Sequence, residues 1–354
     1  MFPVEELQII VQKVLETDGR AALQYGPTEG IHSLREVIAT QRMKPANVNV
    51  TADNIAITTG SQQGIEFSAK LFLNKGDVVI CESPSYLGAL NAFQAYMPKF
   101  VEIQMDDNGM IIDEVEKALK QYPNAKMIYT IPDFQNPTGR TMSNDRRQRL
   151  AELGAKYQIP IIEDSPYGDL IYEGTRHPSI KSFDKEGWVV YLGTFSKTFC
   201  PGLRLGWICA TKEILDKYII IKQGADLQCS SLDQRIAALF METYDLNVHI
   251  EKIKNVYRAR RDLMIKSMDK YFPVGVKHTN PYGGLFIWLE LKEGLNAKEI
   301  LQEALKENVA YVPGSSFFPN GGHQNFARLN FSCMNDEKIV EGIKRLGKVL
   351  GKYN

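Results

Sequence analysis

Residues 191–206 read YLGTFSKTFCPGLRLG and join an apolar run to a polar turn that holds one lysine. The run 188–192 predicts a buried strand that ends at Gly193. Burial disfavours the charged form of an amine, so Lys197 is expected to have the lowered pKa that a covalent amine nucleophile needs. Donors that suit a phosphate surround it: Thr194, Ser196 and Arg204. Taken alone, the stretch also fits a solvated lysine in a polar turn.

The composition predicts a soluble protein with two domains. The chain has 354 residues, with 42 basic and 42 acidic side chains. A net charge of zero argues against a nucleic-acid or anionic-membrane partner held by bulk charge. Five scattered cysteines without a C-x-x-C pattern favour a reducing cytoplasm, and the five histidines show no metal-ligand spacing. No apolar run reaches about 18 residues, and no signal-peptide pattern is visible, so we expect no membrane span and no export.

Strand-like runs alternate with helical patterns from residue 55 to residue 210. We expect strands at 55–58, 78–81, 100–103, 127–130, 159–163, 189–192 and 205–210. Short apolar strands separated by helices are typical of an α/β fold with a mostly parallel sheet covered on both faces. The sequence therefore predicts a large domain with a seven-stranded sheet between helices.

The pattern changes after residue 210. Helical patterns cover 212–223, 232–242, 248–271, 297–307 and 337–350, and strand-like runs cover 285–289, 309–312 and 326–331. This order predicts a smaller α+β domain. We expect an N-terminal helical segment at 1–24 that packs with the small domain, a large domain at 25–245, and a small domain at 246–354 that begins with a long interdomain helix.

Chemically suggestive side chains follow several of the expected strands. They are Gly60-Ser61, Asn136, Asp164, Tyr167 and Lys197. Ligands of open parallel sheets lie beyond the carboxyl ends of the strands. We therefore expect these residues to meet in one site.

Pyridoxal 5′-phosphate (PLP) needs the groups that this site would offer. Lys197 would hold its aldehyde, and Asp164 would keep the ring nitrogen protonated, although an aspartate after a strand is also a common helix cap. Asn136 and Tyr167 would donate to the phenolic oxygen, although Asn-Pro also forms turns. Tyr86 would stack on the ring, or it is a partly buried loop aromatic.

Two further positions suit anions. Gly60, Ser61 and Gln62 open a helix after a strand, and the free N–H groups of such a start bind phosphate, although an ordinary strand-to-helix turn has the same pattern. Arg328 lies in an apolar strand-like run, where a guanidinium needs an anion such as a substrate carboxylate, unless it lies on an edge strand facing water. Asn136 and Tyr86 would complete the substrate contacts.

Together these segments resemble the class I/II aminotransferases of PLP fold type I, most closely the branch of 2-aminoadipate, kynurenine and aromatic amino-acid aminotransferases. The matching motifs are LQYGPTEG (23–30), TTGSQQG (58–64), PSY (84–86), QNPTG (135–139), EDSPY (163–167), TFSK (194–197), PGLRLG (201–206), KQGADL (222–227), GGLFIW (283–288) and ARLNF (327–331). They span nearly the whole chain in the family order.

The resemblance implies a PLP-dependent transfer of an amino group from an L-amino acid to 2-oxoglutarate, with Lys197, Asp164 and Tyr167 as catalytic residues. It implies that Tyr25 reaches the cofactor phosphate of a neighbouring subunit, and hence an obligate homodimer. In relatives, a few tens of residues usually precede the Phe-Pro found here at Phe2-Pro3, and they include a Gly-rich segment that covers the substrate. This sequence begins at Met1 and departs from that pattern, so the resemblance leaves the lid and part of the substrate pocket open. Two alternatives stay open: a PLP-dependent lyase or decarboxylase, and a non-catalytic PLP-binding regulatory module.

Overall fold

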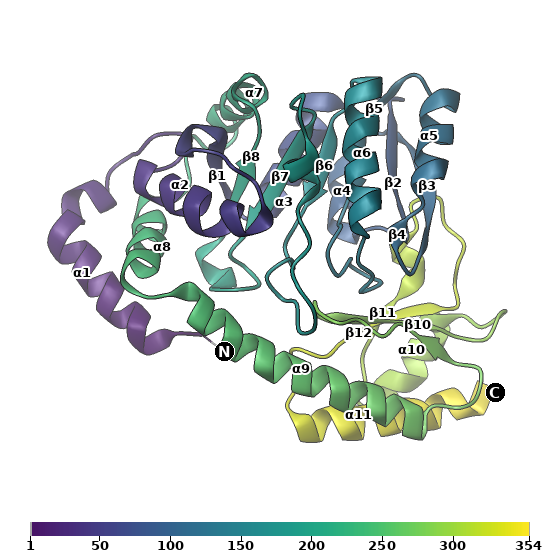
Figure 1. Cartoon of the computed structure of the whole chain (residues 1–354). Helices are drawn as coiled ribbons and strands as arrows, with labels where there is room; N and C mark the ends of the chain where they lie inside the picture. Colours follow the sequence, from purple (N-terminus) through teal and green to yellow (C-terminus); the bar gives the residue numbers. More distant parts are fainter. Residues whose placement is uncertain (1, 354) are drawn as a thin grey trace.

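The computed structural model describes residues 2–353 and contains one large sheet with helices on both faces (Figure 1). From edge to edge its strands are β1 (Ile55–Thr59), β8 (Leu205–Cys209), β7 (Val189–Thr194), β6 (Ile161–Asp164), β5 (Ala125–Thr130), β2 (Val78–Ser83), β3 (Lys99–Asp106) and β4 (Gly109–Met110). Neighbouring strands from β7 to β3 pair in parallel, whereas β8 runs antiparallel to β1 and β7. The prediction of a mostly parallel sheet is confirmed.

The predicted number of seven strands is wrong, because the sheet has eight. The additional strand, β4, is a two-residue segment that pairs antiparallel with the end of β3. Gly109 has a φ of 87° at the turn between them. A strand of two residues leaves no alternation of apolar and polar side chains, so the sequence pattern could not reveal it.

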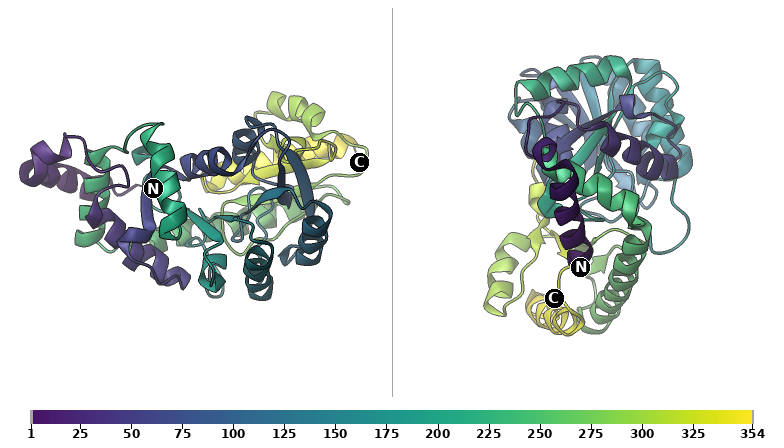
Figure 2. Two further views of the ribbon diagram at one scale, coloured as in Figure 1. Left: turned by 90° about the horizontal axis from the view of Figure 1, so that it is seen from above. Right: turned by 90° about the vertical axis from the view of Figure 1, so that its left-hand side faces the viewer.

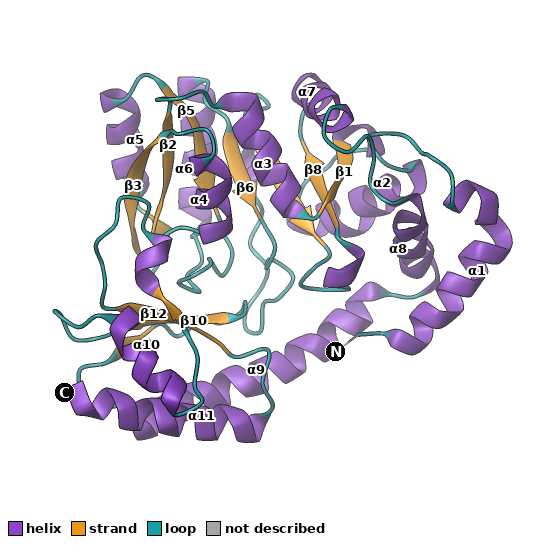
Figure 3. Cartoon of the chain, turned by 180° about the vertical axis from the view of Figure 1, so that it is seen from behind, coloured by secondary structure: helices purple, strands orange, loops and turns teal. Residues whose placement is uncertain are grey.

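Helices cover both faces of the sheet. They are α2 (His32–Ile38), α3 (Ser61–Phe72), α4 (Leu87–Gln94), α5 (Ile112–Gln121), α6 (Asn144–Tyr157), α7 (Lys212–Gln223) and α8 (Ser231–Thr243). Figure 1 shows α6 in front of the sheet, and Figure 3, from behind, shows α3 and α4 in front of it. Val79 of β2 packs with the α3 and α4 side chains, whereas Ile80 packs with those of α5 and α6. Burial of both faces explains the continuous apolar runs of the strands.

The N-terminal helix α1 (Val4–Ala22) lies at one end of the molecule beside α8 (Figures 1 and 2). Its buried residues Ile10 and Val14 share an apolar cluster with Ala237 of α8 and Ile250 of the following helix. The expected helix at the N-terminus is therefore present within the predicted segment 1–24. The domain boundaries after residues 24 and 245 stay a prediction.

The C-terminal part forms a smaller antiparallel sheet with helices on one side (Figure 1). Its strands, in the order β11 (Val312–Pro313), β12 (Phe326–Asn330), β10 (Phe286–Glu290) and β9 (Lys277–His278), are accompanied by α9 (Leu246–Tyr271), α10 (Ala297–Lys306) and α11 (Asp336–Leu350). The strand expected at 309–312 is displaced, because residues 309–311 lead into β11 without pairing. Within residues 2–353, no helix is long and apolar enough to cross a membrane.

Candidate active site

A cavity of about 360 Å³ lies between the carboxyl ends of the large-sheet strands and the inner side of β10 and β12. It brings together every predicted site residue except Tyr25. The predicted residues that line it are Gly60, Ser61, Gln62, Tyr86, Asn136, Asp164, Tyr167, Thr194, Ser196, Lys197, Arg204 and Arg328. Residues from the ends of five strands of the large sheet, β1, β2, β5, β6 and β7, thus meet residues from the smaller sheet, as expected for a ligand site between two packed units.

Lys197 lies in the turn that follows β7. The turn is held by Thr194, whose Oγ1 accepts from the Ser196 backbone N–H at 3.1 Å and donates to Ser196 Oγ at 3.0 Å. Burial lowers the pKa of Lys197 from its ordinary value; Asp164 opposes the shift, and Arg204 and Arg328 add to it. A larger neutral fraction of this amine at neutral pH is what a nucleophile or a base requires.

Asp164 ends β6 and is buried, with 2% of its surface exposed. Its Oδ2 accepts a hydrogen bond of 2.8 Å from the Tyr129 hydroxyl, whereas its Oδ1 is buried without any partner. Burial raises the pKa of Asp164 to about 7, against the lowering effects of Tyr129 and Lys197. A buried carboxylate oxygen without a donor is costly. It is therefore a ready acceptor for a protonated nitrogen on a ligand.

The anion end of the cavity is formed where β1 turns into α3. Gly60 is the N-cap of α3 with a φ of 71°, and a Cβ atom there would lie 2.7 Å from Arg204 Nη2. A Cβ atom on Gly206 would lie 2.6 Å from the Ser61 backbone nitrogen. Both glycines thus let a guanidinium and a helix start approach each other closely, which is the arrangement that binds phosphate.

The opposite end of the cavity centres on Arg328 of β12. Its Nη1 donates to Asn136 Oδ1 at 2.8 Å, and its guanidinium lies 4.2 Å from the centre of the Phe286 ring. Its Nε is buried without a partner, and burial lowers the pKa of Arg328. Tyr167 packs edge-to-face on Phe286, and Asn136 hydrogen-bonds to the Tyr167 hydroxyl. Arg328 is therefore a half-buried cation on the cavity wall, and its buried Nε has no acceptor among the described residues.

The sequence reasoning missed three groups of this site. Phe286 lines the cavity, Phe317 lies under Arg328 with its ring centre 5.2 Å from the guanidinium, and Tyr129 bonds to Asp164. Tyr129 sits inside an apolar strand, where an aromatic residue indicates a packed core. Tyr129 lies 35 residues before Asp164 in the sequence, and the contact arises only because β5 pairs with β6. The sequence pattern therefore gave no sign of this contact.

Tyr25 lies outside the cavity and is 79% exposed. The following residue, Gly26, donates its backbone N–H to the side chain of Gln228. A single chain therefore does not bring Tyr25 to the site.

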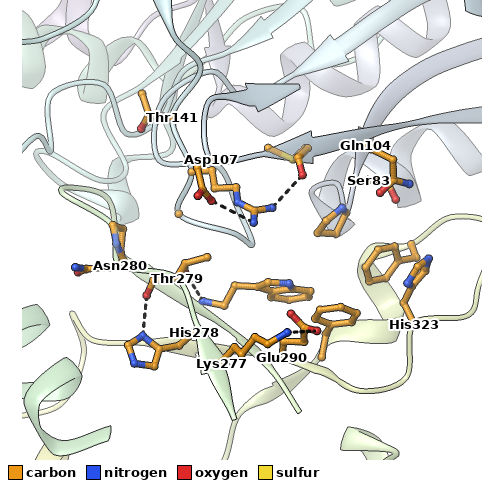
Figure 4. A pocket seen from close by; sticks show the side chains of 18 of the residues that line it. Ser83, Gln104, Asp107, Thr141, Lys277, His278, Thr279, Asn280, Glu290 and His323 are labelled. Atoms are coloured by element: carbon orange, nitrogen blue, oxygen red, sulfur yellow. Dashed lines mark hydrogen bonds and ion pairs between the residues drawn. The ribbon is translucent and has the colours of Figure 1, made fainter. Parts of the chain in front are cut away.

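A larger cleft of about 700 Å³ lies beside the candidate site, and its lining residues are different (Figure 4). Ser83, Gln104 and Thr141 on the large-sheet side face Thr279 and Glu290 on the smaller sheet. The Gln135–Gly139 turn separates the two spaces, since Asn136 lines the first and Gly139 the second. The smaller cavity contains Lys197 and Asp164, and the larger cleft contains none of the predicted site residues. The smaller cavity is therefore the candidate active site.

Comparison with known proteins identifies the family. Residues 2–346 match the family model described as "Aminotransferase class I and II". The chain belongs to this family. It is 44% identical to aromatic-amino-acid aminotransferase 1 of Thermococcus litoralis, over 99% of this chain and 85% of the relative. As a class I and II aminotransferase, it transfers amino groups with PLP as its cofactor.

Two solved structures match this aminotransferase closely. Kynurenine aminotransferase of Pyrococcus horikoshii, in complex with PMP, matches with a TM-score of 0.95 at 41% identity. The match covers 99% of this chain and 88% of the Pyrococcus chain. LysN, the alpha-aminoadipate aminotransferase of Thermus thermophilus, with a phosphopyridoxyl-leucine ligand, has a TM-score of 0.94 at 37% identity, with 99% and 88% covered. The predicted PLP fold type I is thereby confirmed.

Proposed function

We propose that this aminotransferase moves the amino group of an L-amino acid to 2-oxoglutarate in a ping-pong reaction. The observation that carries the proposal is the pairing, in one cavity, of Lys197 with Asp164, whose Oδ1 has no donor. Aromatic, kynurenine and 2-aminoadipate substrates appear in the names of similar proteins. We infer that the donor is 2-aminoadipate or an aromatic or aliphatic amino acid.

The residues present fit PLP. Asp164 Oδ1 is a buried acceptor for the ring nitrogen, and the Gly60 turn leaves beside Arg204 a space that a Cβ atom would fill. When bound, PLP supplies an electron sink that lets the Cα–H bond of an amino acid break. The groups that would hold its phosphate are Ser61, Gln62, Thr194, Ser196 and Arg204. Asn136 and Tyr167 would bind its phenolic oxygen, and Tyr86 would cover its ring.

Lys197 would move the proton. Its lowered pKa favours the neutral amine, which would take the proton at Cα as a base and, once protonated, would serve as the acid. Asp164 would hold the ring nitrogen in its protonated form, because its buried Oδ1 has no other donor among the described residues. Tyr129 orients that carboxylate through the bond to Oδ2.

Arg328 would bind the substrate α-carboxylate. Its guanidinium is already oriented by Asn136 and by the rings of Phe286 and Phe317. Its Nε lacks an acceptor, and a carboxylate would supply one in the bidentate geometry that arginine prefers. Tyr86 and Asn136 would complete the substrate contacts.

We also propose a homodimer with shared active sites. Apolar side chains of the N-terminal region are exposed in the single chain: Phe2, Val4, Ile9, Leu15, Leu23 and Tyr25. An exposed apolar surface of this kind suits a subunit interface. In this arrangement Tyr25 serves the phosphate of the neighbouring subunit.

We further propose the domain division at 1–24, 25–245 and 246–354, and a cytoplasmic location, which the five free cysteines favour.

A panel of L-amino acids with 2-oxoglutarate tests the function. We expect conversion of donors to 2-oxo acids together with formation of glutamate. Keto acid and ammonia formed without any acceptor would indicate a lyase instead, and release of carbon dioxide would indicate a decarboxylase. PLP binding without turnover of any donor would support the regulatory module and contradict the proposal.

A further inference from the structure

Glu82 is a buried carboxylate just outside the candidate site. It lies near the end of β2, is 1% exposed, and is absent from the cavity wall. Its Oε1 accepts from Thr130 Oγ1 at 2.5 Å, and both of its oxygens accept from the Ile131 backbone N–H at 3.3 Å. Glu82 thereby joins the ends of β2 and β5, the two strands that lead into the loops above the cavity.

Gln135 links this carboxylate to both loops. Its Nε2 donates to Glu82 Oε2 at 3.0 Å and to the Pro84 carbonyl at 2.8 Å. Its Oε1 accepts from the backbone N–H and the hydroxyl of Thr138 at 3.0 and 2.7 Å. Gln135 is fully buried. The Thr138 bonds therefore fix which end of the amide faces Glu82, and that end is a donor.

The two loops carry the side chains on either side of the cavity. Asn136 directly follows Gln135, and its Oδ1 accepts from Arg328 Nη1. Tyr86 follows Pro84 by two residues and lines the same cavity. An error of about 1 Å in the placement of such groups costs up to about 100-fold in rate. The position of Asn136 thus depends on the hydrogen bond between Gln135 and Glu82, neither of which lines the cavity.

We propose that Glu82 is a positioning residue that, through Gln135, sets the places of Asn136 and Tyr86 and so the affinity for the amino-acid carboxylate and for PLP. The inference rests on the proposed function of Asn136, Tyr86 and Arg328. The ionised carboxylate is the form that fits, since Thr130, Ile131 and Gln135 all donate to it. Burial raises the pKa of Glu82 to about 7, and these three hydrogen bonds oppose the rise.

A matched control exists at the end of β6, which β5 separates from β2 in the sheet. Glu163 of β6 is also fully buried and also accepts from a hydroxyl and from backbone N–H groups, those of Ser179, Ile180 and Lys181. Its partners belong to the segment 179–181, which contributes nothing to the cavity. Glu82→Gln and Glu163→Gln therefore make the same chemical change at similar burial. Glu163 directly precedes Asp164, but its side-chain hydrogen bonds lead to the segment 179–181, whereas those of Glu82 lead to Gln135.

The experiment compares both variants with the wild-type enzyme. In Glu82→Gln we expect the amino-donor KM and the PLP dissociation constant, measured by equilibrium dialysis, each to rise about tenfold, with a smaller change in kcat. In Glu163→Gln both constants stay within about twofold, although the unfolding temperature falls in both variants. Gln135→Leu removes the link and keeps Glu82, so it should reproduce the effects of Glu82→Gln. If Glu82→Gln does not fold, Gln135→Leu serves as the test of the positioning role in its place.

The proposal would be overturned if the amino-donor KM and the PLP dissociation constant were the same in Glu82→Gln, Gln135→Leu and Glu163→Gln. The dialysis measurement separates this failure from a failure of the proposed function. If the wild-type enzyme converts no amino acid, the transamination proposal fails, whereas a selective loss of PLP affinity in the Glu82 and Gln135 variants still supports the positioning role.

Discussion

Asp164 has one carboxylate oxygen bonded to Tyr129 and one without a donor, and this asymmetry has a thermodynamic consequence. Its pKa is raised from 3.8 to about 7 in the protein without cofactor. A carboxyl group with a raised folded pKa holds its proton more tightly in the folded state. Its contribution to stability is therefore complete below about pH 3.8 and is lost as the pH rises toward 7.

Asp164→Asn removes this titration. In cofactor-free protein, we expect the unfolding temperature of the variant, relative to wild type, to increase as the pH rises from about 4 to about 7. With PLP bound, the order reverses at neutral pH, because the wild-type carboxylate gains the ring nitrogen as a partner. Thermal unfolding across this pH range, with and without PLP, checks both signs.

A difference between Asp164→Asn and wild type that is independent of pH would contradict the assigned burial effect.

At the scale of elements, the turn from β1 into α3 is the part of the site that depends most on backbone shape. Gly60→Ala adds a Cβ atom 2.7 Å from Arg204 Nη2 at a φ of 71°. We expect the PLP dissociation constant to rise at least about tenfold, because the guanidinium and the helix start can no longer face one phosphate. Equilibrium dialysis measures the effect.

Gly76 provides the control for backbone strain. It also has a positive φ, of 86°, but a Cβ atom there would meet nothing within 4 Å. Gly76→Ala should lower stability without changing PLP affinity. If Gly60→Ala and Gly76→Ala bound PLP equally well, the turn would not be the phosphate site.

The sequence predicted elements better than it predicted contacts between them. Lys197, Asp164 and Asn136 could be placed because each follows a strand, and parallel strands end at one edge of a sheet. Tyr129 could not be placed, because its partner is set by strand order. Neither the two-residue β4 nor the stacking of Phe286 on Arg328 leaves a periodic signal.

At the scale of the whole molecule, the cavity lies between the two sheets, so each sheet supplies part of its wall. By our proposal, the large-sheet side contributes the groups for PLP, and β12 contributes Arg328. Tyr25, which is exposed on the single chain, belongs by our proposal to the site of a second subunit. A dimer of this kind allows a test by mixing subunits.

The test uses Tyr25→Ala and Lys197→Ala, each of which we expect to be impaired alone. After subunit exchange, a mixed dimer has one site with both residues intact and one site with both replaced. Activity should therefore recover to about a quarter of the wild-type level, since about half of the dimers are mixed. If mixed dimers form without any recovery, Tyr25 does not act across the subunit interface.

The central claim is that Lys197 holds PLP through a covalent bond to its amine. Reduction of the PLP-loaded enzyme with borohydride, followed by peptide mass mapping, tests it most directly. We expect a stable pyridoxyl group on Lys197 alone, and no labelled peptide from Lys197→Ala. A pyridoxyl group on any other lysine of the wild-type enzyme, or none at all, would contradict it.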